Sequence, residues 1–181
     1  MAAYEDIMSL AKSCGFSEAV SLDVSTLEFL PEVRDMCASG KCNKFGRSWS
    51  CPPAAPSLED MRETVKKYSK GIIVQTVGRL EDSYDYEAMM DAAKNQIESF
   101  GRLWDVLEPL YPGLYPMSTG GCSKCKQCTY PDAPCCFPKR MAYSMEACGL
   151  FVSKVCTDNG AKYNYGPNTI TYTGCFLYGD L

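Results

Sequence analysis

The feature of this chain that most constrains its fold is a dense group of cysteines within residues 120–138. It contains, in order, Cys122, Cys125, Cys128, Cys135 and Cys136, and Pro138 follows. Two intervening residues between thiols let the backbone turn so that successive thiolates converge on one inorganic core. Ferredoxin-type iron–sulfur clusters are bound by a C-x2-C-x2-C run whose last Cys lies further on, next to a proline. The segment is therefore predicted to form a loop around a metal centre.

The number of cysteines needs an explanation other than stability. The chain has 12 Cys in 181 residues, and a domain of this length buries a large core without cross-links. Its first residues are acidic and amphipathic rather than basic and then apolar, as an export signal would be, and no apolar run is long enough to span a membrane. We therefore expect a cytoplasmic protein with no membrane contact, in which dense cysteines are metal ligands rather than disulfides.

The absence of histidine narrows the kind of metal site. The chain contains no histidine, which excludes mixed Cys/His zinc fingers and all-His catalytic zinc sites. What remains is all-thiolate ligation, either an iron–sulfur cluster or a zinc site of four cysteines. The net charge of −4 argues against nucleic acid as a partner, because phosphate-binding surfaces are basic.

A second cysteine-rich loop lies upstream, over residues 37–53. It contains Cys37, Cys42 and Cys51, and Cys51 is followed by two prolines, Pro52 and Pro53. The Cys-Pro ending resembles the end of a ferredoxin motif, and two-cluster ferredoxins exchange their last Cys between clusters. The pair of loops predicts one or two [4Fe–4S] clusters, with zinc as the alternative.

The fourth ligand of each group is the open question. For the downstream run, Cys135 is the natural fourth thiolate, after a longer gap than in ferredoxins. The upstream group lacks an obvious fourth ligand. Cys136 is one candidate, because adjacent residues in extended backbone point to opposite sides. A second possibility is that two clusters exchange their last ligands, Cys51 and Cys135, so that each of these cysteines binds the cluster of the other loop. A third is that the upstream cluster has three protein ligands and one open iron.

The hydrophobic pattern predicts a single α/β (α+β) domain over residues 1–181, with a small mixed sheet and flanking helices. Helical periodicity indicates helices at 4–13, 58–69, 84–107, 145–147 and 151–158. β-Branched and alternating segments indicate strands at 19–24, 71–77, 114–119, 170–173 and 175–178. The inward face of the long helix is predicted to consist of Tyr86, Met89, Met90, Ala93, Ile97, Phe100, Trp104 and Leu107.

Four further cysteines lie in apolar or helical surroundings, outside both loops. They are Cys14, Cys148, Cys156 and Cys175. Because free Cys is among the most buried residue types, these four are predicted to be core residues rather than ligands.

The two loops together resemble a known family, the prokaryotic predicted metal-binding proteins called domain of unknown function 2284. The resemblance covers most of the chain. It rests on Cys37, Cys42, Phe45-Gly46, Trp49, Cys51-Pro52-Pro53, Gly121-Cys122, Cys125, Cys128, Tyr130-Pro131, Pro134-Cys135, Phe137-Pro138, Ser144-Met145-Glu146-Ala147 and Gly149. It implies metal or iron–sulfur binding and brings no established reaction. Cys136 stands where the family pattern leads us to expect arginine.

Three functions are compatible with these features. The first is electron transfer, or a redox-accessory role, in an anaerobic metabolism and with a redox partner protein. The second is a small enzyme with an open-iron cluster, and the third is a structural zinc protein. Acid–base candidates for an enzyme are Tyr130, Lys139, Arg140, Ser144 and Glu146. A cluster of cations beside the downstream run either offsets the charge of a thiolate-bound cluster or docks an acidic partner; it comprises Lys124, Lys126, Lys139 and Arg140.

Overall fold

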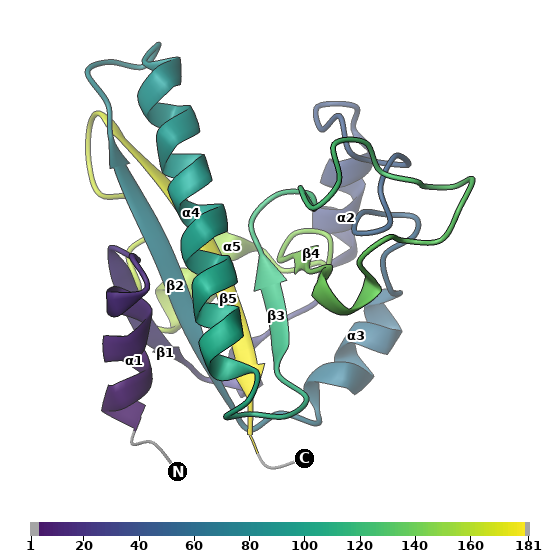
Figure 1. Ribbon diagram of the computed structural model, residues 1–181, viewed down its shortest axis with the longest axis horizontal. Helices are drawn as coiled ribbons and strands as arrows, with labels where there is room; N and C mark the ends of the chain where they lie inside the picture. The colour runs from purple at the N-terminus through teal and green to yellow at the C-terminus, as the bar shows by residue number, and fades with distance from the viewer. Residues whose placement is uncertain (1–3, 180–181) are drawn as a thin grey trace.

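A computed structural model describes residues 4–179, and their side chains from residue 7 onward (Figure 1). Five strands form one mixed sheet in the order β1-β2-β5-β3-β4. The strands are β1 (Glu18–Leu22), β2 (Lys70–Arg79), β3 (Tyr115–Ser118), β4 (Tyr143–Ser144) and β5 (Thr169–Tyr178). The helices are α1 (Tyr4–Ser13), α2 (Pro31–Ala38), α3 (Leu58–Val65), α4 (Tyr86–Leu107) and α5 (Val152–Asp158), with short 3₁₀ turns at Val24–Thr26 and Pro138–Arg140. The predicted α+β class is confirmed.

The long central pair of the sheet is β2 and β5. They run antiparallel in register from Lys70 opposite Tyr178 to Arg79 opposite Thr169. β1 adds antiparallel to β2, and β3 adds antiparallel to β5. The short edge strand β4 is the exception, because it lies parallel to β3. A parallel pair needs a long connection, and the segment between these two strands is the downstream cysteine loop.

Each face of the sheet is covered by its own group of apolar side chains. On one face, Ile72 and Val74 of β2 pack with α1 and α4. On the other, Ile73 packs with α3, with α5 and with the turn of residues 145–150. This alternation is the two-residue period of a strand that is buried on both sides. The two cysteine loops lie outside both layers, beside α2 and β4 and away from α1 (Figure 1).

The predicted inward face of α4 is wrong over the first half of the helix. Tyr86 and Met90 are 68% and 70% exposed, whereas Ala92, Gln96 and Ser99 are buried. The physical reason is Gly78 in β2. A Cβ added to this residue would lie 2.7 Å from the Cβ of Ala92, so strand and helix approach too closely for large side chains. Phe100, Trp104 and Leu107 are buried as predicted.

Several element boundaries differ from those predicted. The two strands expected at 170–173 and 175–178 are one continuous strand, β5. The helix expected at 58–69 ends at Val65, and the segment 145–147 forms a turn rather than a helix. The strand expected at 19–24 ends at Leu22, because the Asp23 side chain accepts a hydrogen bond from Ser25 N and begins a 3₁₀ turn.

The prediction for the four core cysteines is confirmed. Cys14 packs in the layer beneath α1 and α4. Cys148, Cys156 and Cys175 lie in the opposite layer and are 0% exposed. Burial raises the pKa of the Cys148 thiol to about 12, and it also raises those of Cys156 and Cys175. These thiols are therefore held in the neutral form that suits a core.

Candidate metal centre

The parallel pairing of β3 and β4 brings both cysteine loops to one place. The downstream loop leaves the end of β3 and returns to the start of β4, with Ser118 paired to Ser144. Gly120 has a φ of +62°, a left-handed conformation that favours glycine. A Cβ on Gly121 would lie 3.0 Å from Cγ of Lys44. Glycines at these positions thus let the upstream loop pack directly against the end of β3.

Trp49 of the upstream loop packs against the downstream loop. Its indole N–H donates a hydrogen bond of 3.0 Å to the carbonyl of Ala133. Its ring lies edge-on to that of Tyr130, with 4.9 Å between centroids. Nearby, the N–H of Cys122 donates to Oγ of Ser50 at 3.0 Å. The loops are therefore one packed unit, although more than 70 positions separate Cys122 from Ser50 in sequence.

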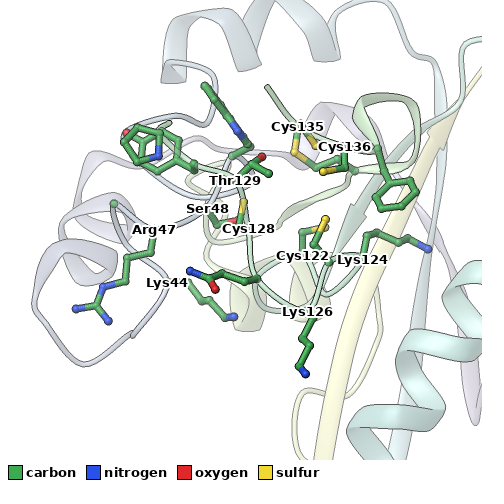
Figure 2. A pocket seen from close by; sticks show the side chains of 18 of the residues that line it. Lys44, Arg47, Ser48, Cys122, Lys124, Lys126, Cys128, Thr129, Cys135 and Cys136 are labelled. Carbon is green, nitrogen blue, oxygen red and sulfur yellow. The ribbon is translucent and has the colours of Figure 1, made fainter. Parts of the chain in front are cut away.

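Five downstream thiols line a single cavity of about 480 Å³, here called the downstream cavity. They are the thiols of Cys122, Cys125, Cys128, Cys135 and Cys136. Figure 2 shows the labelled sulfurs turned toward the middle of this cavity, while Arg47 and Lys126 extend away from it. The structure thus gathers all the cysteines of the downstream run around one space.

Cys128 has the most distinctive environment of the five. Its sulfur accepts hydrogen bonds from three backbone N–H groups and one hydroxyl, those of Trp49, Tyr130, Thr129 and Ser48. Desolvation opposes ionisation, but these donors outweigh it and lower the pKa of the Cys128 thiol. Backbone donors aimed at a sulfur stabilise a thiolate, which is the form that binds metal.

The adjacent pair Cys135 and Cys136 differs in its neighbours. Burial, a hydrogen bond with Cys136 and the charges of Cys136, Cys122 and Cys128 together raise the pKa of the Cys125 thiol. Cys136 therefore lies within the thiol group formed by the C-x2-C-x2-C run. Cys135 lines the same cavity and acts electrostatically on Tyr143 at the start of β4. Both candidates for the fourth ligand are present, and Cys136 is the one in contact with Cys125.

Cations surround the downstream cavity, but they are not the set that the sequence suggested. Lys124 and Lys126 line it as expected, together with Lys44 and Arg47 of the upstream loop. Arg140 instead forms ion pairs with Asp105 and with Glu108 of the α4 region, and its guanidinium lies 4.4 Å from the ring centroid of Trp104. These ion pairs hold the end of the loop against α4, so the charge of Arg140, which the sequence grouped with the cations beside the downstream run, is offset by carboxylates.

The three upstream thiols line a separate cavity of about 470 Å³, here called the upstream cavity. Cys37 lies in the last turn of α2, Cys42 is exposed on the following loop, and Cys51 is buried. Burial is the main reason why the pKa values of Cys37 and Cys51 are raised. The upstream cavity is also lined by Gly120, Ser144 and Glu146, so residues from the downstream half complete it.

The two cavities are separated by two buried serines of the upstream loop. Oγ of Ser48 and Oγ of Ser50 are 3.0 Å apart. Oγ of Ser50 also lies 3.8 Å from the sulfur of Cys51. Ser48 acts on both cavities, since its hydroxyl lies close to Cys51 and to Cys128 and favours the ionised form of either thiol. Sequence reasoning overlooked these serines; their alternation with Trp49 and Cys51 was the available signal.

The thiols are gathered but not drawn to coordination distance. Among the described residues, no three side chains of Cys, Asp or Glu form a group that would hold a metal ion without moving. The chemistry of the donors nevertheless fits a thiolate-bound metal, because several thiols share each cavity and hydrogen-bond donors lower the pKa of the Cys128 thiol. Ligation requires rotation of side chains and closure of the exposed loops around the metal.

Comparison with known proteins shows the family of the chain, but it assigns no ligand residues. No curated protein and no solved structure matches the chain significantly. No helix within residues 4–179 is both long and apolar enough to cross a bilayer. One family model does match, over residues 20–178, which include every cysteine of both loops. The chain therefore belongs to the family described as predicted metal-binding protein, domain of unknown function 2284.

Proposed function

We propose that the downstream cavity binds an iron–sulfur cluster and that the protein passes single electrons to a redox partner. The observation that carries the proposal is the gathering of Cys122, Cys125, Cys128 and the pair Cys135–Cys136 around one cavity. A [4Fe–4S] cluster takes four cysteine thiolates, and the cavity offers five. When bound, the cluster would supply a one-electron redox couple.

The surroundings of the cavity suit this role. N–H donors to a ligating sulfur stabilise its negative charge, and such bonds adjust the reduction potential of a cluster. The described residues form no ion pairs with Lys44, Arg47, Lys124 or Lys126, which leaves these cations available at the rim. A basic rim accelerates the encounter with an acidic partner. We propose a cytoplasmic protein of anaerobic metabolism, with an acidic redox protein as its partner.

Metal and sulfide content test the proposal directly. Protein purified without oxygen, or reconstituted with iron and sulfide, is expected to be brown and to contain both elements. The variant Cys128→Ala removes a ligand and should lose this cluster. The matched control Cys156→Ala removes a buried core thiol and should keep it. Zinc without sulfide would support the structural alternative, and iron retained in full by Cys128→Ala would overturn the assignment of the site.

A second pair of variants identifies the fourth ligand. Cys135 is the choice that ferredoxin spacing favours, and Cys136 is the choice that contact with Cys125 favours. We infer that Cys136→Ala loses more cluster than Cys135→Ala. The opposite order would restore Cys135 as the fourth ligand. Iron and sulfide per chain, measured on both variants in parallel, distinguish the two.

A further inference from the structure

The upstream cavity contains an acidic side chain that the sequence considered only as a general acid or base. Glu146 lines it together with Cys37, Cys42 and Cys51. The four residues come from three places: the end of α2, the loop that follows it, and the turn after β4. The upstream cysteines lacked a fourth ligand in sequence, and a carboxylate from the other half of the chain stands beside them.

The backbone holds Glu146 in this place. The N–H of Met145 donates to the carbonyl of Ser118 at 3.0 Å, and the N–H of Gly149 donates to the carbonyl of Glu146 at 2.9 Å. Met145 and Ala147 on either side are buried in the core. With both neighbours turned inward, Glu146 is directed into the upstream cavity.

α2 is fixed to the same turn. The N–H of Leu30, the residue before α2, donates to the carbonyl of Gly149 at 2.8 Å. A Cβ on Gly149 would lie 2.5 Å from Cδ2 of Leu58 and 3.4 Å from the backbone of Leu30. The turn that carries Glu146 and the helix that carries Cys37 are therefore held as one unit. Cys42 lies on the exposed loop that follows, outside this unit, and would have to approach the other two thiols to share a ligand with them.

The carboxylate of Glu146 has no ion-pair partner among the described residues, and the nearby charge of Arg34 acts on Cys37 and Cys148. Glu146 is partly buried, and within residues 4–179 it forms no ion pair. Its hydrogen bonds come from Ser144 and from its own N–H. The nearest thiols would add further negative charge once ionised. A partly buried anion among potential anions is unfavourable unless a cation neutralises it.

We propose that the upstream cavity is a second metal centre, in which the thiolates of Cys37, Cys42 and Cys51 and the carboxylate of Glu146 are the four protein ligands. Three sulfurs and one oxygen make a complete tetrahedral set for a divalent ion. The oxygen is the hardest of these donors and the one most readily exchanged for an incoming molecule. This centre differs from the all-thiolate downstream centre in having one replaceable position.

Titration of the metal-free full-length chain with Co²⁺ tests the proposal, because tetrahedral cobalt thiolates absorb visibly and report the number of sulfur ligands. Wild type should bind at two distinct sites. Glu146→Gln, which keeps the size of the side chain, should weaken one site by about tenfold or more and leave the other spectrum unchanged. Glu146→Cys should restore tight binding with stronger sulfur-to-cobalt charge transfer. Glu32→Gln, an exposed position in the first turn of α2, is the matched control.

Unchanged affinity and spectrum in Glu146→Gln, while Cys37→Ser loses the site, would overturn the role of Glu146. If Cys37→Ser still binds cobalt at both sites, the proposal of an upstream metal centre is wrong. Cys128→Ala should remove the other cobalt site alone. Failure of the downstream proposal would therefore leave the Glu146-dependent cobalt in place, and the two failures are distinguishable. Circular dichroism of each variant confirms that the fold is retained.

Discussion

The loop cysteines and the core cysteines of this chain lie in two different environments. Cys175 lies in the sheet opposite Ile73 and is 0% exposed, in a layer of apolar side chains. Cys128 lies in a loop, where backbone N–H groups and a hydroxyl point at its sulfur. Desolvation without donors keeps the first thiol neutral and inert, whereas donors lower the pKa of the second. The environment of Cys128 thus differs from that of a core thiol, whereas burial raises the pKa of Cys37 and Cys51 as it does that of Cys175.

Alkylation of the metal-free protein should separate the two groups most strongly. At neutral pH the exposed thiols of Cys42 and Cys136 should react rapidly with iodoacetamide. Cys156 and Cys175 should react at least about a thousandfold more slowly than these exposed thiols. They become accessible only on unfolding, which costs about 5–15 kcal/mol. Peptide mass spectrometry over time measures each site. In urea all should react alike; native Cys175 reacting as fast as Cys42 would contradict the comparison.

The next effect concerns the contact that makes the loops one unit. Trp49→Ala removes the hydrogen bond to Ala133 and the packing on Tyr130. These contacts should stabilise the docked loops by about 2 kcal/mol. Proteolysis within residues 120–138 should therefore accelerate about 30-fold, while the urea midpoint of the sheet stays nearly constant.

Trp49→Phe is the matched control, since it keeps an aromatic ring against Tyr130 and loses only the donor to Ala133. Its cleavage rate should lie between those of wild type and Trp49→Ala. Equal rates for all three proteins would show that Trp49 does not hold the loops together.

Local patterns were sufficient for most of the secondary structure. Helix α4 and strand β2 were predicted within a few residues, because each has a long apolar period and clear ends. The inward face of α4 was not predicted correctly, because it depends on the close approach of Gly78 in β2 to Ala92 in α4. Tertiary packing of this kind leaves no trace in the periodicity of the helix itself.

The candidate site also has residues that the sequence predicted and residues that only the fold revealed. Spacing alone predicted the thiols of the downstream run, and the structure places them around one cavity. Spacing did not reveal the position of Glu146 beside the upstream thiols, because it depends on the parallel pairing of β3 with β4. Nor did it show that Arg140 is bound to α4. Local sequence thus indicated the metal chemistry, and topology supplied the neighbours.

Unfolding at alkaline pH should test whether the buried core thiols stay protonated in the folded protein. Burial holds the pKa of Cys175 well above its ordinary value in the folded state, so above about pH 9 the unfolded chain loses this proton and the folded chain keeps it. Stability is then present in full at neutral pH and falls as pH rises, by about 1.4 kcal/mol per unit for one such thiol. Urea unfolding at several pH values measures the slope. Cys175→Ala should make the slope shallower by about this amount, because Cys148 and Cys156 still contribute to it, and an identical slope in that variant would contradict the assignment.

The smallest effect concerns a hydroxyl beside the sulfur of Cys128, a proposed ligand. Ser48 is 2% exposed, and its hydroxyl favours the ionised form of Cys128 and of Cys51, one cysteine from each loop. Ser48→Ala removes a donor worth about 1 kcal/mol to a thiolate, so metal should transfer to a chelator about fivefold faster. Ser123→Ala, at an exposed serine of the downstream loop, should not change the rate. If the two variants release metal equally, backbone N–H groups alone stabilise the Cys128 thiolate, and the difference between ligand and core thiols rests on the main chain.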